Sequence, residues 1–325
     1  MGQIVSFIIQ KGGCGKTTTT VNIGGYLATQ GYKVLTVDMD PQGNLTQHFG
    51  YDSDSLEACL TDLFMQRKNL QEVVIKRDEN LHILPNNISM TDVEFSLFKS
   101  LSREYILRDV LHPVQHDYDF ILIDCPPNLG ILSVNALVAS TEFIMTVAPE
   151  FFPMKAIKPL YDTYSRVKSQ LNRTLRFKGV VMTLADFRTR HSQEVRKVLE
   201  RNFPQRLYKA YVRNSVSLKE ASSMGKTIFE YDPQSIGAFD YQNVAEEFLL
   251  DHGPARQKMA YYEEAFQQLP EEKQTQILEY ARSRLSSFNK SRLDDLGEDD
   301  AVQSALVIER NKVLERLFPY RHQTG

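Results

Sequence analysis

Residues 10–18, Gln-Lys-Gly-Gly-Cys-Gly-Lys-Thr-Thr, have the composition of a phosphate-binding turn. They follow an apolar run at 4–9 that predicts a buried strand, and they precede an apolar-periodic segment at 21–27 that predicts a helix. In a glycine-rich turn between a strand and a helix, backbone N–H groups converge on one point, and the helix N-terminus adds partial positive charge there. The stretch therefore predicts a nucleotide phosphate site.

Two lysines in this turn have different expected roles. Lys16 supplies a full charge for the outer phosphates, and the neighbouring Thr17 hydroxyl can hold Mg²⁺. The turn departs from the standard P-loop, because Gln10 stands where that pattern has glycine and Lys11 is added. Since Lys16 already serves the bound nucleotide, we interpret Lys11 as reaching across an interface to a partner's nucleotide, which would couple ATP binding to dimerisation.

Three carboxylates are expected beside the phosphates. Asp124 ends an apolar strand at 120–124, which suits an acid that holds the water shell of Mg²⁺. Asp38 and Asp40 follow another apolar strand at 33–38, and strand alternation puts both carboxylates on the same side. Either of these two can contact the waters of Mg²⁺ and orient the attacking water.

The order of the elements predicts the fold class. Apolar strands are expected at 4–9, 33–38, 81–85, 120–124, 142–147, 178–183 and 206–211, with helices at 91–111, 130–140, 154–171 and 191–202. This alternation favours an α/β fold with a doubly wound, mostly parallel sheet flanked by helices. Ligands bind beyond the carboxyl ends of such strands, where the turn and the three acids are expected.

Composition limits the class of protein. The 325 residues are 42% hydrophobic and 24% charged, and no apolar run is long enough to span a membrane. No signal peptide is expected before the first strand. The three cysteines are scattered, which favours a reducing cytoplasm and disfavours a disulfide framework or an iron–sulfur site.

The formal net charge of −3 conceals an asymmetry. Residues 155–226 hold 17 Lys or Arg against 5 Asp or Glu, a net charge of +12, so the remainder carries −15. A basic region of this size is typical of a surface that binds a polyanion. A basic face that only aids solubility is the alternative.

The chain is expected to divide at His252-Gly253-Pro254 into an ATPase domain, 1–253, and a helical extension, 254–325. Pro270 resembles a helix start, followed by an apolar stripe of Ile277, Ala281, Leu285 and Phe288; a second helical pattern covers 301–318. The extension could pack on the sheet or on a dimer mate, dock a partner, or bind a membrane. The last is least favoured, because acids interrupt the basic face of the second helix.

Five stretches resemble the ParA family of deviant Walker A ATPases, within the ParA/MinD superfamily. They are Lys11 to Thr17, Asp38 to Asn44, Asp124 to Pro127, Asn128 to Leu137 and Val212 to Ala238. The resemblance covers residues 1 to about 250. MinD-like and nitrogenase-reductase-like proteins share the loop but match the later stretches less well, and the reductase's cysteine pair is missing.

The resemblance implies a cycle that uses ATP and Mg²⁺. ATP would drive a homodimer that binds DNA non-specifically, and a ParB-like partner would stimulate slow hydrolysis and release, segregating a plasmid, a chromosome or another cargo on the nucleoid. The implied phosphate contacts are Gly12, Gly13, Cys14, Gly15, Lys16, Thr17 and Thr18. Lys11 becomes the signature lysine, and Asp40 serves hydrolysis. Thr17, Asp38 and Asp124 support the metal, while Asn214, Asp232 and Pro233 lie near the adenine.

DNA contacts are expected from Arg213, Lys219 and Lys226, acting on phosphates and therefore sensitive to salt. Many relatives are basic near Gln234 and Ile236, where this chain is neutral, and typical ParA proteins lack the extension. Two other functions are considered: a MinD-like, membrane-associated positioning ATPase, and a nucleotide-switched regulatory adaptor with negligible turnover. No stable membrane association is expected.

Overall fold

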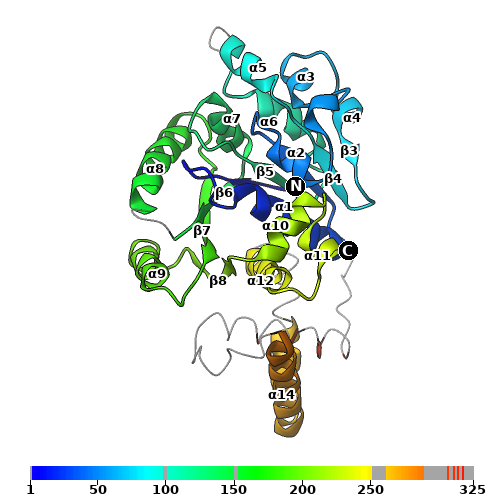
Figure 1. Ribbon diagram of the computed structural model, residues 1–325, viewed down its shortest axis with the longest axis vertical. Helices are drawn as coiled ribbons and strands as arrows, with labels where there is room; N and C mark the ends of the chain where they lie inside the picture. The colour runs from blue at the N-terminus through cyan, green and yellow to red at the C-terminus, as the bar shows by residue number, and fades with distance from the viewer. Residues whose placement is uncertain are drawn as a thin grey trace.

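The computed structural model describes residues 2–97, 101–149, 153–250 and 261–288, with residues 306, 310, 311, 313, 314 and 317. Its centre is an eight-stranded sheet in the order β3-β4-β2-β5-β1-β6-β7-β8 (Figure 1). The strands are β1 (Gln3–Phe7), β2 (Val34–Asp38), β3 (Ile75–Lys76), β4 (Leu81–Leu84), β5 (Phe120–Asp124), β6 (Glu142–Val147), β7 (Arg176–Ala185) and β8 (Leu207–Arg213). All neighbouring strands pair in parallel except β3 with β4.

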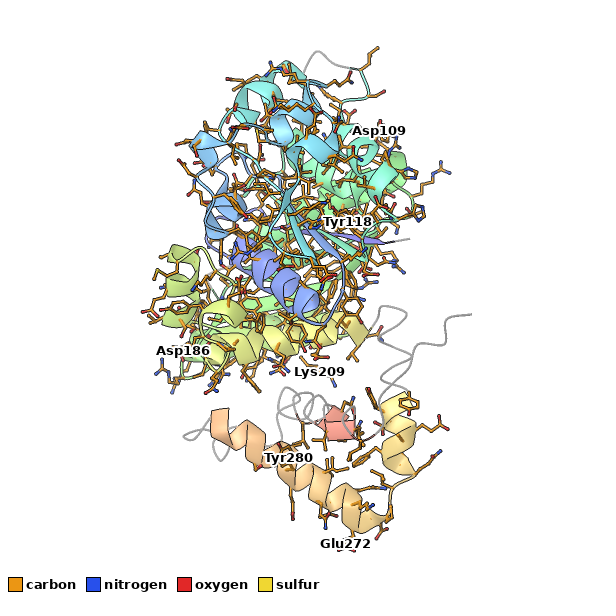
Figure 2. All side chains as sticks on the ribbon, turned by 90° about the vertical axis from the view of Figure 1, so that its right-hand side faces the viewer. Asp109, Tyr118, Asp186, Lys209, Glu272 and Tyr280 are labelled. Carbon is orange, nitrogen blue, oxygen red and sulfur yellow. The ribbon has the colours of Figure 1, made fainter. Side chains whose placement is uncertain are left out.

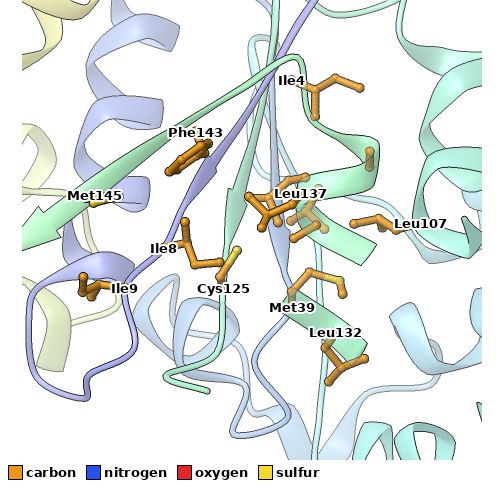
Figure 3. Close-up of a cluster of buried hydrophobic side chains, with 14 of the residues drawn as sticks. Ile4, Ile8, Ile9, Met39, Leu107, Cys125, Leu132, Leu137, Phe143 and Met145 are labelled. Carbon is orange, nitrogen blue, oxygen red and sulfur yellow. The ribbon is translucent and has the colours of Figure 1, made fainter. Parts of the chain in front are cut away.

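Helices cover both faces of the sheet. They are α1 (Lys16–Thr29), α2 (Asn44–His48), α3 (Leu60–Phe64), α4 (Leu70–Val73), α5 (Met90–Leu97), α6 (Ile106–Leu111), α7 (Ile131–Ala139), α8 (Pro153–Gln170), α9 (Arg190–Asn202), α10 (Val216–Ser223), α11 (Ile228–Tyr231), α12 (Ile236–Leu250) and α14 (Glu271–Phe288). One apolar cluster joins the sheet to α1, α2 and α10–α12, and the other joins it to α3–α9. Figure 3 shows part of the second cluster, including Ile4, Leu137 and Cys125. Because both faces are covered, central strands such as β2 and β5 are buried along their whole length.

The predicted fold class is confirmed, but some predicted elements were wrong. The expected helix at 91–111 is two helices, because α5 ends at Leu97 and α6 begins only at Ile106. Between them Ser102 has a φ of 54°, a left-handed conformation that a continuous helix does not accommodate. The short helices α2 to α4 and the two-residue strand β3 were not predicted, since such elements carry no measurable periodicity.

The described part of the extension forms a small apolar cluster of its own. Helical residues 261–267 and α14 enclose Tyr262, Phe266 and Ile277, with Leu314 from the last described segment. Arg310 forms an ion pair with Glu263 at 2.5 Å. Figure 2 shows α14, labelled at Glu272 and Tyr280, below the sheet domain.

The extension touches the sheet domain through α12. Ala281 and Leu306 cluster with Leu278, and Phe239 of α12 packs against them. Of the predicted stripe, Ile277 and Ala281 are buried as expected; the side chains of Leu285 and Phe288 lie outside the described residues, as does the predicted boundary at 253/254. No helix in the described part of the chain is long and apolar enough to cross a membrane.

Candidate nucleotide-binding site

The glycine-rich turn connects β1 to α1 as predicted. Gly13 and Gly15 have φ values of 70° and 71°, which only glycine adopts without strain. A Cβ on Gly12 or Gly13 would meet no described atom within 4 Å, so the turn is open on its outer side. Among the described residues no side chain caps the first turn of α1, which leaves its backbone N–H groups available to an anion.

The loop is held by contacts that sequence inspection did not reveal. The Thr183 hydroxyl, from β7, donates to the Cys14 carbonyl at 2.9 Å. The Lys16 side chain is only 7% exposed, and its Nζ donates to the Lys11 carbonyl at 2.7 Å. Lys16 is therefore positioned inside the loop, while Lys11 is half-buried at its start.

Two buried acids lie side by side behind the loop. Asp38 and Asp124 end the paired strands β2 and β5 in matched register, and both are fully buried. Burial raises the pKa of Asp38 to about 7, against the opposing hydrogen bonds from Thr46. Burial, and then the charge of Asp38, raise the pKa of Asp124 well above its usual range, against the hydrogen bond from Thr17. Two adjacent carboxyl groups in this environment need a cation to remain ionised together.

Thr17 and Asp124 fit a magnesium ion that arrives with a nucleotide. The Thr17 hydroxyl donates to Asp124 Oδ2 at 2.6 Å, and Asp124 Oδ1 has no hydrogen-bond partner among the described residues. No group of three His, Cys, Asp or Glu side chains in the described chain could hold a metal alone. A Mg²⁺ ion here would need phosphate oxygens and waters to complete its coordination, which is how Mg²⁺ usually binds.

Asp38 also organises the segment that carries Asp40. Asp38 Oδ2 accepts hydrogen bonds from the Thr46 backbone N–H at 2.9 Å and from its hydroxyl at 2.8 Å. Its Oδ1 accepts from the Asp40 N–H at 3.2 Å. The Asp40 carboxylate accepts in turn from the Gln42 N–H at 3.0 Å and from Asn44 Nδ2 at 3.4 Å. Asp40 is thus oriented just beyond β2, close enough to Asp124 for its charge to act on that carboxyl. Thr46, which supports Asp38, and Asn44, which supports Asp40, were missed.

A cavity of about 380 Å³ adjoins the turn and has the position expected for the rest of a nucleotide. It lies between Gly13, Gly15 and Thr18 of the loop, the end of β7, α10 and Tyr241 of α12. The Tyr241 and Thr19 hydroxyls are 3.1 Å apart, which ties α12 to α1. The wall of this cavity is therefore built by helices that lie far apart in the sequence.

The residues predicted near the adenine follow β8 and α11. Asn214 follows β8, and its N–H donates to the carbonyl of Ala185, the last residue of β7, at 3.3 Å. Asp232 follows α11 and accepts from the Gln234 N–H at 3.3 Å. Neither they nor Pro233 belong to the described lining of the 380 Å³ cavity. Their contact with adenine stays a prediction.

The three residues predicted to contact DNA have different surroundings. Arg213 forms an ion pair at 2.5 Å with Asp240, whose carboxylate is buried in α12, and also donates its backbone N–H to it. Lys219 is exposed on α10 at the rim of the nucleotide cavity, and Lys226 is exposed just after α10. Arg213 thus has a structural partner that the sequence did not indicate, and its DNA contact stays a prediction.

The fold and this edge of the sheet define a P-loop nucleotide-binding protein, and comparisons with known proteins agree. A family model described as "AAA domain" (AAA_31) matches residues 2–177. The sporulation initiation inhibitor protein Soj of Bacillus subtilis is 39% identical over 248 residues, covering 76% of this chain and 98% of that protein. The chromosome-partitioning ATPase Soj of Treponema pallidum is 38% identical over 256 residues, covering 78% and 99%.

A solved structure gives the same fold. Cobyrinic acid a,c-diamide synthase from Mycobacterium smegmatis, solved with ADP and magnesium, matches with a TM-score of 0.68 and 30% identity over 77% of this chain and 95% of that one. The chain belongs to the Soj/ParA family of chromosome-partitioning ATPases, within the ParA/MinD group. Its general function is that of a partition or positioning ATPase.

Proposed function

We propose that the chain hydrolyses Mg²⁺-ATP slowly and uses the nucleotide to switch between a DNA-bound dimer and a released form. The observation that carries the proposal is the contact of Thr17 with the buried Asp124, whose second carboxylate oxygen has no partner among the described residues. A buried, unpartnered carboxylate oxygen is costly unless a cation or water reaches it. ATP with Mg²⁺ at this site supplies that cation.

Each residue of the site has a separate role in hydrolysis. Lys16 and the loop N–H groups bind the phosphates, and Thr17 with Asp124 holds the metal and its waters. Asp38 fixes the segment that follows β2, so that Asp40 can orient the attacking water. Bound Mg²⁺ neutralises the charge that develops on the phosphates. Turnover in the isolated chain is expected to be slow, because a stimulating partner completes the arrangement.

Dimerisation is assigned to the ATP-bound form. Lys11 stands at the outer start of the turn, and its backbone carbonyl already positions Lys16. Its charge acts on the nucleotide of a second copy, so ATP and dimer stabilise each other. Lys11→Ala is therefore expected to bind labelled ATP normally and to sediment as a monomer in ATP. An ATP-dependent dimer of this variant would refute the role in trans.

DNA binding is assigned to the exposed lysines on and just after α10, Lys219 and Lys226, and needs the ATP state. We expect random-sequence duplex to bind in ATP and to be released in ADP or high salt, because contacts to phosphates displace counterions. Lys226→Ala should weaken binding and reduce the salt slope by about one unit. Lys273→Ala, which removes an exposed lysine of α14 in the extension, is the matched control. Equal retention on DNA in ATP and in ADP would contradict the proposed nucleotide switch.

The decisive experiment for hydrolysis is Asp40→Ala. We expect this variant to dimerise in ATP and to remain on DNA, since only the water-positioning group is lost. Phosphate release should fall about tenfold or more, with and without a ParB-like stimulating partner. Unchanged turnover and unchanged release from DNA would favour the alternative of a nucleotide-switched adaptor. The cargo is a plasmid, a chromosome or another large body moved over the nucleoid.

A further inference from the structure

Two adjoining cavities lie at the amino edge of the sheet, opposite the nucleotide edge. One, of about 520 Å³, lies between α8, the end of α9 and the turn before β8. The other, of about 390 Å³, lies between the starts of β6 and β7 and the end of α8. Phe177 and Arg206 line both, so the two cavities adjoin, and we call them together the amino-edge groove.

Positive charge is concentrated along the amino-edge groove. Its described lining contains five basic side chains, Lys158, Lys168, Arg176, Lys178 and Arg206, and a single acid. That acid, Glu142, is 2% exposed and is paired with Arg176 at 3.3 Å. The groove therefore has a net charge of +4 among these residues, and it accounts for part of the basic region between 155 and 226.

Two of these cations are held in place by the protein itself. Lys168 Nζ donates to the Leu175 carbonyl at 2.6 Å. The Arg206 guanidinium donates to the Phe177 carbonyl and lies over the Phe177 ring, 5.3 Å from its centroid. Fixed cations lose less conformational entropy on binding a carboxylate than mobile surface lysines do.

The larger cavity has an apolar wall beside these charges. Tyr161, 47% exposed, contacts the Tyr164 ring with centroids 5.6 Å apart. Phe177 and Phe203 meet edge to face at 5.6 Å on the other side. A pocket with aromatic walls and fixed cations at its rim binds an apolar anchor flanked by negative charge.

We propose that the amino-edge groove binds an acidic peptide segment of a partner protein, with an aromatic or aliphatic side chain in the larger cavity and carboxylates against the cations. Charge complementarity selects an acidic occupant. The aromatic wall favours a peptide over duplex DNA, whose phosphates would use only the cationic half. Because the groove lies at the opposite edge from the phosphate-binding turn, this partner and the nucleotide bind the chain at the same time.

The test uses the full chain and a fluorescein-labelled acidic peptide that carries Phe and Leu among glutamates. Fluorescence anisotropy should show saturable binding that weakens with salt, in ATP and in ADP. Lys158→Glu should weaken it about tenfold, and Tyr161→Ser about fivefold, because both side chains are at the groove surface. Arg166→Glu makes the same charge change on an exposed position of α8 outside the described groove lining, and should change affinity less than twofold.

Two further probes separate the parts of the proposal. The same peptide with Gln for Glu, or with Ser for Phe and Leu, should bind about tenfold more weakly or worse. Equal losses for Lys158→Glu and Arg166→Glu would show general charge attraction and overturn the proposal. Tighter binding of a duplex DNA competitor, reduced by Lys158→Glu but not by Tyr161→Ser, would overturn it in favour of nucleic acid. ATP hydrolysis should be the same in these variants without peptide, which separates this outcome from the proposed function.

Discussion

The ion pair between Arg213 and Asp240 allows a sharp test of whether Arg213 serves the fold or DNA. Arg213→Ala removes the partner of a carboxylate that is 3% exposed and leaves it without a counter-charge. Breaking a buried pair in this way costs about 3–5 kcal/mol. We expect this loss to be a large fraction of the free energy of unfolding, and therefore to lower the urea unfolding midpoint at pH 7 markedly. Unfolding is monitored by circular dichroism, with and without ATP.

The same variant should show a defined dependence on pH. Burial raises the pKa of Asp240, against the hydrogen bonds and charge of Arg213. Without Arg213 the folded pKa rises further above the unfolded value, so the folded chain binds more protons. The free-energy cost of the unpaired carboxylate therefore grows as pH rises above the unfolded aspartate pKa of about 4. The deficit relative to the wild type should be largest at pH 7 and should shrink as the pH is lowered.

Two controls make the result interpretable. Asp240→Asn combined with Arg213→Ala should recover much of the lost stability, because no buried charge is left. Arg188→Ala breaks an exposed pair with Asp186 and should leave the urea midpoint unchanged. An Arg213→Ala chain that keeps its midpoint while losing affinity for DNA would refute the structural role.

Three further outcomes are expected. Burial lowers the pKa of His48 to about 4, so the wild type should lose about 2 kcal/mol between pH 7 and pH 5 as the unfolded histidine gains a proton, and urea unfolding of His48→Gln should show a smaller loss. Gly25→Ala would place a Cβ 2.7 Å from Thr227 Cγ2, and thermal unfolding should show a loss of about 1–3 kcal/mol. Thr17→Val removes the hydroxyl that donates to Asp124; titration with fluorescent ATP should show that Mg²⁺ no longer strengthens binding.

The sequence was informative where function depends on neighbours in the chain. The turn around Lys16 and the acids at the ends of β2 and β5 could be placed, since each follows an apolar strand and carboxyl ends of parallel strands share one edge. Contacts between segments that are distant in the sequence could not be placed in this way. Nothing in the sequence around Asp240 indicated that Arg213, 27 residues earlier, would bind it.

Local support around Asp40 is an intermediate case. Thr46 lies only eight residues after Asp38, and a hydroxyl so close to a strand-ending acid was visible in the sequence. The role of Thr46 was missed because α2 is only five residues long, which is too short for a helical periodicity to be recognised in the sequence. The roles of Asp38 and Asp40 could thus be proposed from sequence, whereas the hydrogen bonds that orient them required the fold.

The helix α12 connects the two ends of the edge strand β8. Near its start Asp240 holds Arg213, and near its end the Glu247 carboxylate accepts the N–H groups of Lys209 and Ala210 at 2.9 and 2.8 Å. These bonds satisfy edge amides that a further strand would otherwise pair. The same helix presents Tyr241 to the nucleotide cavity and packs Phe239 against the extension. Because a helix attached at both ends moves as one body, any shift of α12 on nucleotide binding must also shift the surface on which the extension rests.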